Sequence, residues 1–238
     1  MTQRLAPAVE DQRWATPAGT LRQLAAARAP LVPRWSAAEY RDLLGKLHGH
    51  GQPFLTFAEY CAGERGVWLR HDVELNVGSA LRMARAEARL DIRASYFLCW
   101  ESPALIATPE DRRREFVHEL LLLGHSVGVH SWFTVLERAP EWCSIEAVTF
   151  HRPRQHLDFF LRYPVGRSVY QPIADGVVTY LSDSAGRWRG RPPDELWTGR
   201  QPLQLLIHPF WWSKGAGPIS LQVTPAIEQF LPQASAGQ

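Results

Sequence analysis

Cysteine is scarce in this sequence: Cys61, Cys99 and Cys143 form an odd set without paired spacing. Such a set excludes a disulfide framework and is typical of proteins in a reducing compartment. The first residues, MTQRLAPAVEDQRW, carry charge but lack the apolar segment that a secretory signal contains. Long apolar runs are lacking as well, since none approaches the roughly 18 residues of a membrane span. We therefore expect a cytoplasmic protein without a membrane partner.

An excess of charge of one sign is also missing. The chain has 26 Lys and Arg residues against 24 Asp and Glu residues, a formal net charge of +2. Proteins that bind nucleic acids present a strongly basic surface instead. Lysine is almost absent, with only Lys46 and Lys214, but such a skew toward arginine reflects genome composition more often than a recognition surface. The composition thus predicts no nucleic-acid partner.

Apolar residues are abundant, at 45% of the 238 residues. A chain of this length buries roughly 70–75% of the surface that its unfolded form exposes, so it needs neither a disulfide nor a metal in order to fold. We expect residues 36–232 to form one domain. Residues 1–35, rich in Ala, Arg and Pro, are expected to be loosely ordered, and residues 233–238 to form a flexible tail.

Predicted strands and helices alternate through the middle of the chain. Apolar periodicity predicts strands at 67–75, 92–100 and 125–132, and helices at about 36–50, 77–90 and 108–124. Three further strands are predicted at 147–151, 177–182 and 203–208. Strands joined through helices at this spacing favour a parallel sheet covered by helices, in an α/β barrel or an open α/β sheet.

Ionisable residues follow several predicted strands, where the carboxyl ends of parallel strands form the active-site face of an α/β fold. Asp72 and Glu74 are two residues apart and project to one side of their strand, whereas His71 points to the other. Neighbouring carboxylates repel each other unless a cation lies beside them. The pair therefore indicates a cation site, with a solvated strand end as the alternative.

Two histidines of the 125–132 strand face opposite sides, because five residues separate them. They cannot both ligate one ion. His130 lies at the carboxyl end and is the candidate metal ligand. His125 follows Gly124 at the start of the strand, and we expect it to be buried and hydrogen-bonded within the protein.

Seven segments match, in order, the motifs of one family. They read LRHDVEL, ALRMARAEARL, ASYFL, GHSVGVHS, TFHRP, YLSDSAGRW and LQLLIHPFWW. The chain therefore resembles, over about residues 36–212, the polysaccharide deacetylase-like proteins of the NodB-homology type, carbohydrate esterase family 4. The resemblance is strongest to the branch whose first motif reads RHDVD.

The resemblance implies a distorted (β/α) barrel, often of seven strands, that removes an N-acetyl group from a sugar with the help of a metal ion such as Zn²⁺. It implies that Asp72 is the general base, that Glu74 and His130 bind the metal, and that His208 is the general acid. These four residues end three of the predicted strands.

Further residues match positions near the family's site. Asp183 corresponds to the acid that orients the catalytic histidine, although an Asp after a strand also caps turns. Arg152 lies where the family has an arginine near the catalytic Asp. Three tryptophans are candidates for the wall of a sugar pocket, with plain packing as the alternative. They are Trp188, Trp211 and Trp212.

Several positions depart from the family pattern. Thr134 stands where the family has its second histidine ligand, which leaves two ligands where a hydrolytic Zn²⁺ site generally has three. His151, at the end of a separate strand, is the candidate third ligand. Glu74 replaces an Asp, and Ser126 replaces a Glu. The stretch from His130 to His151 is too short for a full helix, so one helix of the barrel is expected to be missing and that side to be open or covered by a partner subunit.

Three hypotheses follow from these residues. The first is a metal-dependent deacetylase that acts on a small or nucleotide-linked N-acetyl sugar. The second is an inactive binding or scaffold protein that has lost a ligand through Thr134. The third is a metal-dependent hydrolase of a non-sugar amide or imide.

Overall fold

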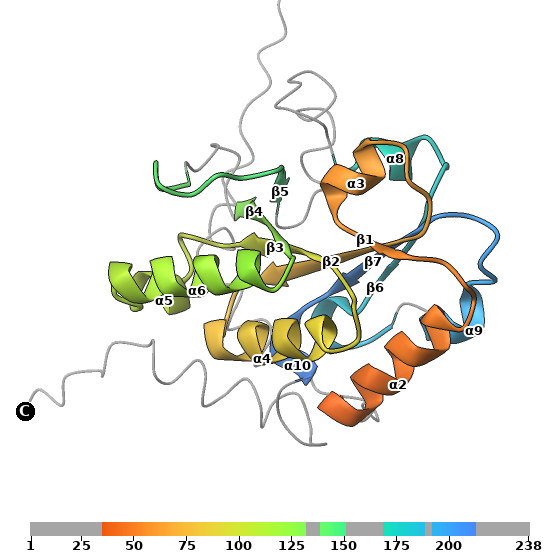
Figure 1. Ribbon diagram of the computed structural model, residues 1–238, viewed down its shortest axis with the longest axis horizontal. Coiled ribbons are helices and arrows are strands. Elements are labelled where there is room, and N and C mark those ends of the chain that lie inside the picture. The colour runs from red at the N-terminus through yellow and green to blue at the C-terminus, as the bar shows by residue number, and fades with distance from the viewer. Residues whose placement is uncertain (1–34, 132–138, 151–168, 189–191, 213–238) are drawn as a thin grey trace, which may run out of the picture.

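The computed structural model describes residues 35–131, 139–150, 169–188 and 192–212, so statements on structure concern these ranges (Figure 1). They form a mixed α/β fold around one curled parallel sheet. Its strands are β1 (Phe54–Leu55), β2 (Val67–Val73), β3 (Ser95–Leu98), β4 (Ser126–Ser131), β5 (Val148–Phe150), β6 (Thr179–Ser182) and β7 (Leu203–Ile207). Six of them follow the order β5-β4-β3-β2-β7-β6, and β1 pairs with the start of β2.

The direction of the crossovers distinguishes the two α/β architectures that the sequence left open. The steps from β2 to β3, β4 and β5, and from β6 to β7, all move the same way across the sheet, and every pair is parallel. Right-handed crossovers in one direction place their helices on one face, as in a barrel, whereas a doubly wound sheet reverses direction. The last strand, β7, also lies beside β2. The described sheet is therefore a half-barrel, compatible with the expected distorted barrel.

Helices cover the outer face of this half-barrel. Figure 1 shows α2 (Ala37–His48), α4 (Val77–Ala88), α6 (Glu110–Leu122) and α10 (Pro209–Trp212) on one side of the sheet. The shorter helical segments are α3 (Phe57–Cys61), α5 (Pro103–Ile106), α8 (Gln171–Ala174), η3 (Ser184–Gly186) and α9 (Pro193–Leu196). No helix in the described ranges is long and apolar enough to cross a membrane.

Capping side chains mark the starts of α2 and α4. The Ser36 side chain accepts a hydrogen bond from the Glu39 backbone at the start of α2, and the Asn76 side chain does the same for Ser79 at the start of α4. These caps satisfy backbone donors that the first helical turn leaves free. Trp35, at the end of the segment expected to be loosely ordered, is 1% exposed and packs in the core.

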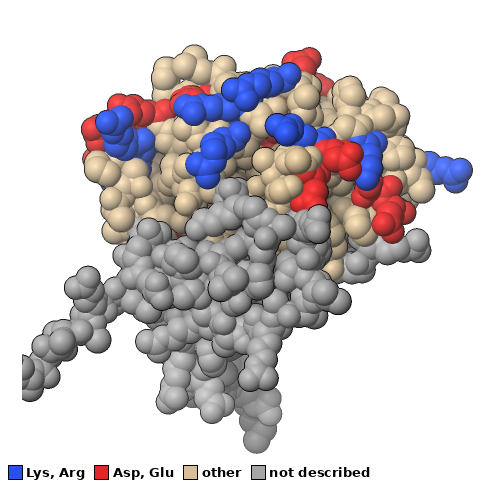
Figure 2. Space-filling view, turned by 90° about the horizontal axis from the view of Figure 1, so that it is seen from below, with Lys and Arg blue, Asp and Glu red and all other residues tan. Residues whose placement is uncertain are grey.

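Charged side chains of both signs alternate on the helix-covered face, which Figure 2 shows from below. Arg85 of α4 pairs with Glu119 of α6 at 2.5 Å, and Arg114 pairs with Glu110 within α6 at 2.7 Å. Such exposed pairs contribute little to stability.

The two faces of the sheet carry different chemistry. Val67, Leu69 and Val73 of β2 belong to the large core beneath the helices, whereas Trp68 belongs to a second, smaller cluster with Phe97. Alternation along β2 therefore places Arg70 and Asp72 on the concave face with Trp68. This confirms the expected separation of Asp72 from its neighbour His71.

Glycine is required at one position of the concave face. A Cβ atom on Gly128 of β4 would lie 2.5 Å from the Phe97 ring and 2.8 Å from the Ala147 carbonyl oxygen. We expect Gly128→Ala to lower the free energy of unfolding by about 1–3 kcal/mol through overpacking. Urea denaturation measures this, with Gly45→Ala as the control, because nothing lies within 4 Å of a Cβ on Gly45, in the exposed face of α2. Equal effects of the two substitutions would contradict the prediction.

Between β4 and β5 the structure describes residues 139–147, which contain turns and no helix. Residues 132–138 lie outside the described ranges, so the expected loss of a barrel helix stays a prediction. Thr134 lies in that part of the chain, and His151 and Arg152 also lie outside the described residues.

Candidate active site

Four predicted site residues come together at the carboxyl ends of the strands. His130 Nδ1 of β4 lies 3.4 Å from Asp72 Oδ2, and His130 Nε2 lies 2.9 Å from Glu74 Oε1, just after β2. His208, just after β7, lines the same pocket as Asp72 and Glu74. Strand ends that are far apart in the sequence thus supply one cluster of ionisable groups.

Asp72 is held by an arginine of its own strand. Arg70 Nε donates to Asp72 Oδ1 at 2.9 Å, and Arg70 Nη2 donates to Oδ2 at 2.7 Å. Both side chains are buried, at 2% and 3% exposed. The guanidinium also lies over the rings of Phe97 and Tyr170, at 5.5 and 5.7 Å from the centroids. This two-point pairing fixes the plane of the carboxylate.

Burial and neighbouring cations shift the pKa of Asp72 in opposite directions. Burial would raise the pKa of its carboxyl, but the charge of Arg70, then those of His130 and His208, lower it below its usual value. Asp72 is therefore ionised at neutral pH. Arg70 occupies both of its oxygens on one side, which leaves the other lone pairs directed at His130 and the pocket.

His130 is oriented from both ring nitrogens. Nδ1 lies 2.8 Å from the Thr149 hydroxyl, and Thr149 is the register partner of His130 on β5. Nε2 lies 2.9 Å from the Glu74 carboxylate, and it would bind an ion beside Glu74 in its unprotonated form, because a metal takes the neutral imidazole. Metal-binding histidines usually have one ring nitrogen held by a second group, as Thr149 holds Nδ1 here. The other nitrogen, Nε2, lies beside the carboxylate of Glu74.

Glu74 and His130 fit two positions of a divalent metal site. Their chemistry suits Zn²⁺, which binds carboxylate oxygen and imidazole nitrogen. Within the described ranges, no three His, Cys, Asp or Glu side chains are arranged to hold an ion. The third ligand predicted from the sequence, His151, lies outside those ranges.

A second ionisable pair faces the first. His208 Nδ1 lies 2.6 Å from Asp183 Oδ1, and the backbone N–H of His208 donates to both oxygens of Asp183 at 3.0 Å. Because an ionised carboxylate only accepts, Nδ1 carries a proton and Nε2 is the nitrogen left for other partners. Asp183 is fully buried, whereas the His208 side chain is 15% exposed.

The environment of His208 favours its charged form. Burial alone would lower the pKa of the imidazole, but the charge and hydrogen bond of Asp183, followed by the charges of Glu74 and Asp72, raise it to about 9. His208 is therefore protonated at neutral pH and can give up a proton from Nε2.

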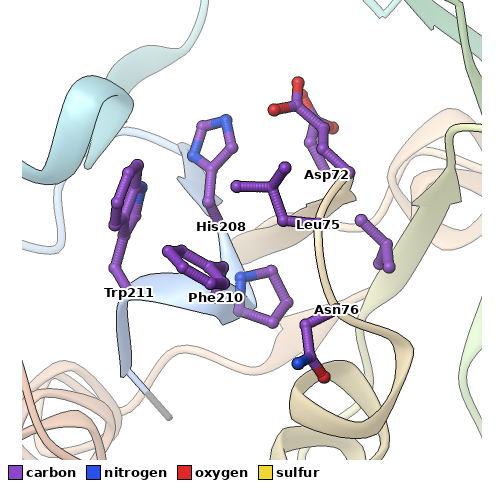
Figure 3. Close-up of a pocket in the computed structure, with 9 residues that line it drawn as sticks. Asp72, Leu75, Asn76, His208, Phe210 and Trp211 are labelled. Carbon is purple, nitrogen blue, oxygen red and sulfur yellow. The ribbon is translucent and has the colours of Figure 1, made fainter. Parts of the chain in front are cut away.

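A small pocket lies between these groups, formed by the segment after β2 and the turn after β7 (Figure 3). Asp72, Glu74 and His208 supply its charged atoms. The remaining lining residues are mostly apolar; they are Val73, Leu75, Asn76, Pro209, Phe210 and Trp211. Figure 3 shows His208 between Trp211 and Asp72, so a bound group would meet the imidazole and the carboxylate together.

The three tryptophans considered for a sugar pocket have different surroundings. Trp211 lines the pocket and is 3% exposed, and its indole nitrogen has no hydrogen-bond partner among the described residues. Trp212 is 5% exposed and donates its indole N–H to Asp183. Trp188 packs against the core next to Trp35 and Trp212. Only Trp211 of the three contacts the described pocket.

His125 lies away from the site, as expected. It is 3% exposed, its Nδ1 accepts from the Ala94 backbone N–H, and its Nε2 lies 3.0 Å from the Ala84 carbonyl oxygen. On the same outer side of the sheet, His71 lies 2.9 Å from the buried Glu87, which also accepts from Tyr40 and Tyr96; the Tyr distances are 2.5 and 2.7 Å.

Sequence reasoning missed two contributors to the site. Arg70 pairs with Asp72, and the available signal was its position two residues before Asp72 on one buried strand; Arg152, the arginine predicted near Asp72, lies outside the described residues. Thr149 orients His130, but this depends on the register between β4 and β5, which no local pattern reveals.

Comparison with protein-family models, with curated proteins and with solved structures gives no match. The resemblance to the deacetylase-like proteins thus rests on the sequence motifs.

Proposed function

We propose that this chain is a metal-dependent hydrolase that removes an N-acetyl group from a sugar or saccharide. The observation that carries the proposal is the pairing of two units around one pocket. Asp72, Glu74 and His130 form an acidic cluster with metal-ligand chemistry, and His208 with Asp183 forms a separate proton donor. Amide hydrolysis needs both, because a water must be activated and the leaving nitrogen must be protonated.

Glu74 and His130, with His151 as the third ligand, would hold a Zn²⁺ or similar ion. When bound, such an ion polarises the amide carbonyl and lowers the pKa of water. Asp72 accepts the proton from the attacking water, in a position that Arg70 fixes. His208 donates a proton from Nε2 to the leaving nitrogen, while Asp183 stabilises the imidazolium.

The apolar lining of the pocket suits a small acyl group. Its apolar lining residues, which include Leu75 and Phe210, offer contacts for a methyl group. Trp211 adds a large aromatic side chain to the lining, which supports a sugar as the substrate.

The finer features of the fold belong to the same proposal. We propose a seven-stranded distorted barrel that lacks one helix and opens on that side to substrate or to a partner subunit. The low cysteine content, three residues in the chain, supports a reducing, cytoplasmic location.

An inactive binding protein is the alternative that a specific observation favours. Arg70 occupies both oxygens of Asp72, and the described residues supply two metal ligands. A cluster neutralised in this way could bind a saccharide without hydrolysing it.

Release of acetate tests the proposed function. We would purify the protein without added metal, measure its metal content, and follow acetate release from N-acetylglucosamine and from its nucleotide-linked form with and without Zn²⁺. We expect release that depends on Zn²⁺ and stops with a chelator. Binding of these sugars without acetate release would favour the inactive binding protein, and hydrolysis of a non-sugar amide or imide alone would favour the third hypothesis.

Zinc titration tests the ligand set. We expect both His130→Ala and His151→Ala to lower Zn²⁺ affinity by roughly 10–100-fold or more, since even partners of the ligands have effects of this size. Thr134→His should restore part of the affinity in the His151→Ala background. Calorimetric titration measures each variant. Unchanged binding in His151→Ala would remove His151 from the site.

The pH dependence of kcat/KM should report His208. Its pKa, raised to about 9, predicts that activity falls as the pH rises through that value, because the proton donor is lost. Protein stability should fall in the same direction as activity. The raised pKa of His208 stabilises the folded protein fully below the unfolded pKa of about 6.5, and this stabilisation is lost as the pH rises through about 9. His208→Gln should remove the alkaline limb, and a limb that persists in this variant would contradict the assignment.

A further inference from the structure

Asp183 accepts hydrogen bonds from His208 and from Trp212. It accepts from the His208 backbone N–H at both oxygens, from His208 Nδ1 at Oδ1, and from the Trp212 indole N–H at Oδ2 over 2.8 Å. The two bonds from the backbone fix the carboxylate near His208 but do not distinguish its two oxygens. The Trp212 indole distinguishes them, because it donates to Oδ2 alone and leaves Oδ1 facing Nδ1 of His208.

The Trp212 ring is held in place by other aromatic rings. Its centroid lies 4.4 Å from that of Trp35, 5.2 Å from that of Tyr40 and 6.1 Å from that of Trp188. Trp35 is itself fixed by a bond from its indole nitrogen to the Gly186 carbonyl oxygen at 3.1 Å. The donor that meets Asp183 is thus oriented in advance by packing, at no further entropic cost when His208 changes its charge.

We propose that Trp212 is a positioning residue for His208, which it orients through Asp183. The proposal rests on the function proposed above only for the role of His208 as the acid. Trp212 keeps Oδ1 on Nδ1 and excludes water from Oδ2, so that the carboxylate of Asp183 keeps the one orientation in which Oδ1 stabilises the imidazolium. The adjacent Trp211, whose indole nitrogen has no hydrogen-bond partner among the described residues, faces the pocket instead.

The other charges that face His208 come from β2. Asp72 and Glu74 also favour its protonated form, and neither is bonded to Trp212. Loss of the indole N–H should therefore weaken only the contribution of Asp183. A phenylalanine at position 212 keeps the aromatic packing, removes the donor and leaves room for water beside Oδ2.

NMR titration of the His208 imidazole in the ligand-free protein tests the proposal. We expect Trp212→Phe to lower the pKa of His208, with proton affinity falling roughly tenfold, as one pKa unit implies. Trp188→Phe is the matched control, since it makes the same change in the same ring cluster without a bond to Asp183. An unchanged titration in Trp212→Phe, or equal shifts in both variants, would overturn the proposal.

A second measurement covers the case in which Trp212→Phe does not fold. In Asp183→Asn, the indole proton resonance of Trp212 should move strongly, while that of Trp35, bonded to a backbone carbonyl, should move little. Equal movement of the two would overturn the proposal. Neither measurement needs a substrate, so a protein without deacetylase activity can still show the positioning effect, and an active enzyme can still fail to show it.

Discussion

Asp72→Asn should reduce acetate release by roughly 10²–10⁴-fold, the usual contribution of a general base. Asparagine has almost the same shape but cannot accept a proton from water. Asp72 is not one of the proposed metal ligands, so the variant should bind Zn²⁺ with nearly unchanged affinity. The loss should therefore appear in kcat, measured at saturating Zn²⁺ by acetate release.

The control for this prediction is Asp183→Asn, which weakens the acid while leaving the base intact. It should lower kcat less and shift the alkaline limb of the pH profile further than Asp72→Asn does, because Asp183 raises the pKa of His208 more than Asp72 does. Retention of more than a tenth of the activity in Asp72→Asn, well above the range for a lost base, would exclude Asp72 from that role.

Arg70→Leu should have the largest effect on stability. The substitution leaves Asp72 buried without its cation, and breaking a buried ion pair from one side costs about 3–5 kcal/mol. Urea denaturation gives the free energy of unfolding, and Arg70→Lys, which retains a charge but not the two-point geometry, should lose less.

The pH dependence of this loss has a definite sign. In the native protein the lowered pKa of Asp72 contributes stability above its unfolded value of about 3.9, which is lost as the pH falls through the folded value. In Arg70→Leu, burial without Arg70 would raise that pKa, so the variant should lose stability as the pH rises above the unfolded value of about 3.9.

The double variant Arg70→Leu/Asp72→Asn provides the check. Removing the charge of the carboxylate as well should recover much of the lost stability, because no uncompensated ion stays buried. A double variant as unstable as Arg70→Leu alone would mean that Arg70 acts through its contacts with Phe97 and Tyr170 rather than through its charge.

Local patterns in the sequence predicted those parts of the fold that depend on short-range periodicity. The alternation of strands and helices from β2 to β4, and the opposite directions of His71 and Asp72, follow from apolar spacing and the two-residue repeat of a strand. The burial of His125 was expected from its distance of five residues from His130, and the structure confirms it.

Long-range contacts were beyond such reasoning. The two-residue spacing of Arg70 and Asp72 placed both on one face, but it did not reveal that the Arg70 guanidinium lies over the rings of Phe97 and Tyr170 from other parts of the chain. Trp212 was considered for substrate binding because a large aromatic residue followed His208, but its partner Asp183 is 29 residues earlier in the chain. Each contact depends on how separate strands pack, which spacing within one segment does not encode.

The position of β7 beside β2 divides the chemistry between two parts of the chain. The first part, up to β5, carries Asp72, Glu74 and His130, while the part from β6 onward carries Asp183 and His208. They meet mainly through the β2–β7 ladder, in which Val67 pairs with Leu203 and His71 with Ile207. A chain severed between β5 and β6 would thus yield one fragment with the base and one with the acid, each incomplete alone. Such fragments would suit a complementation reporter, because the complete site would form only when the two associate.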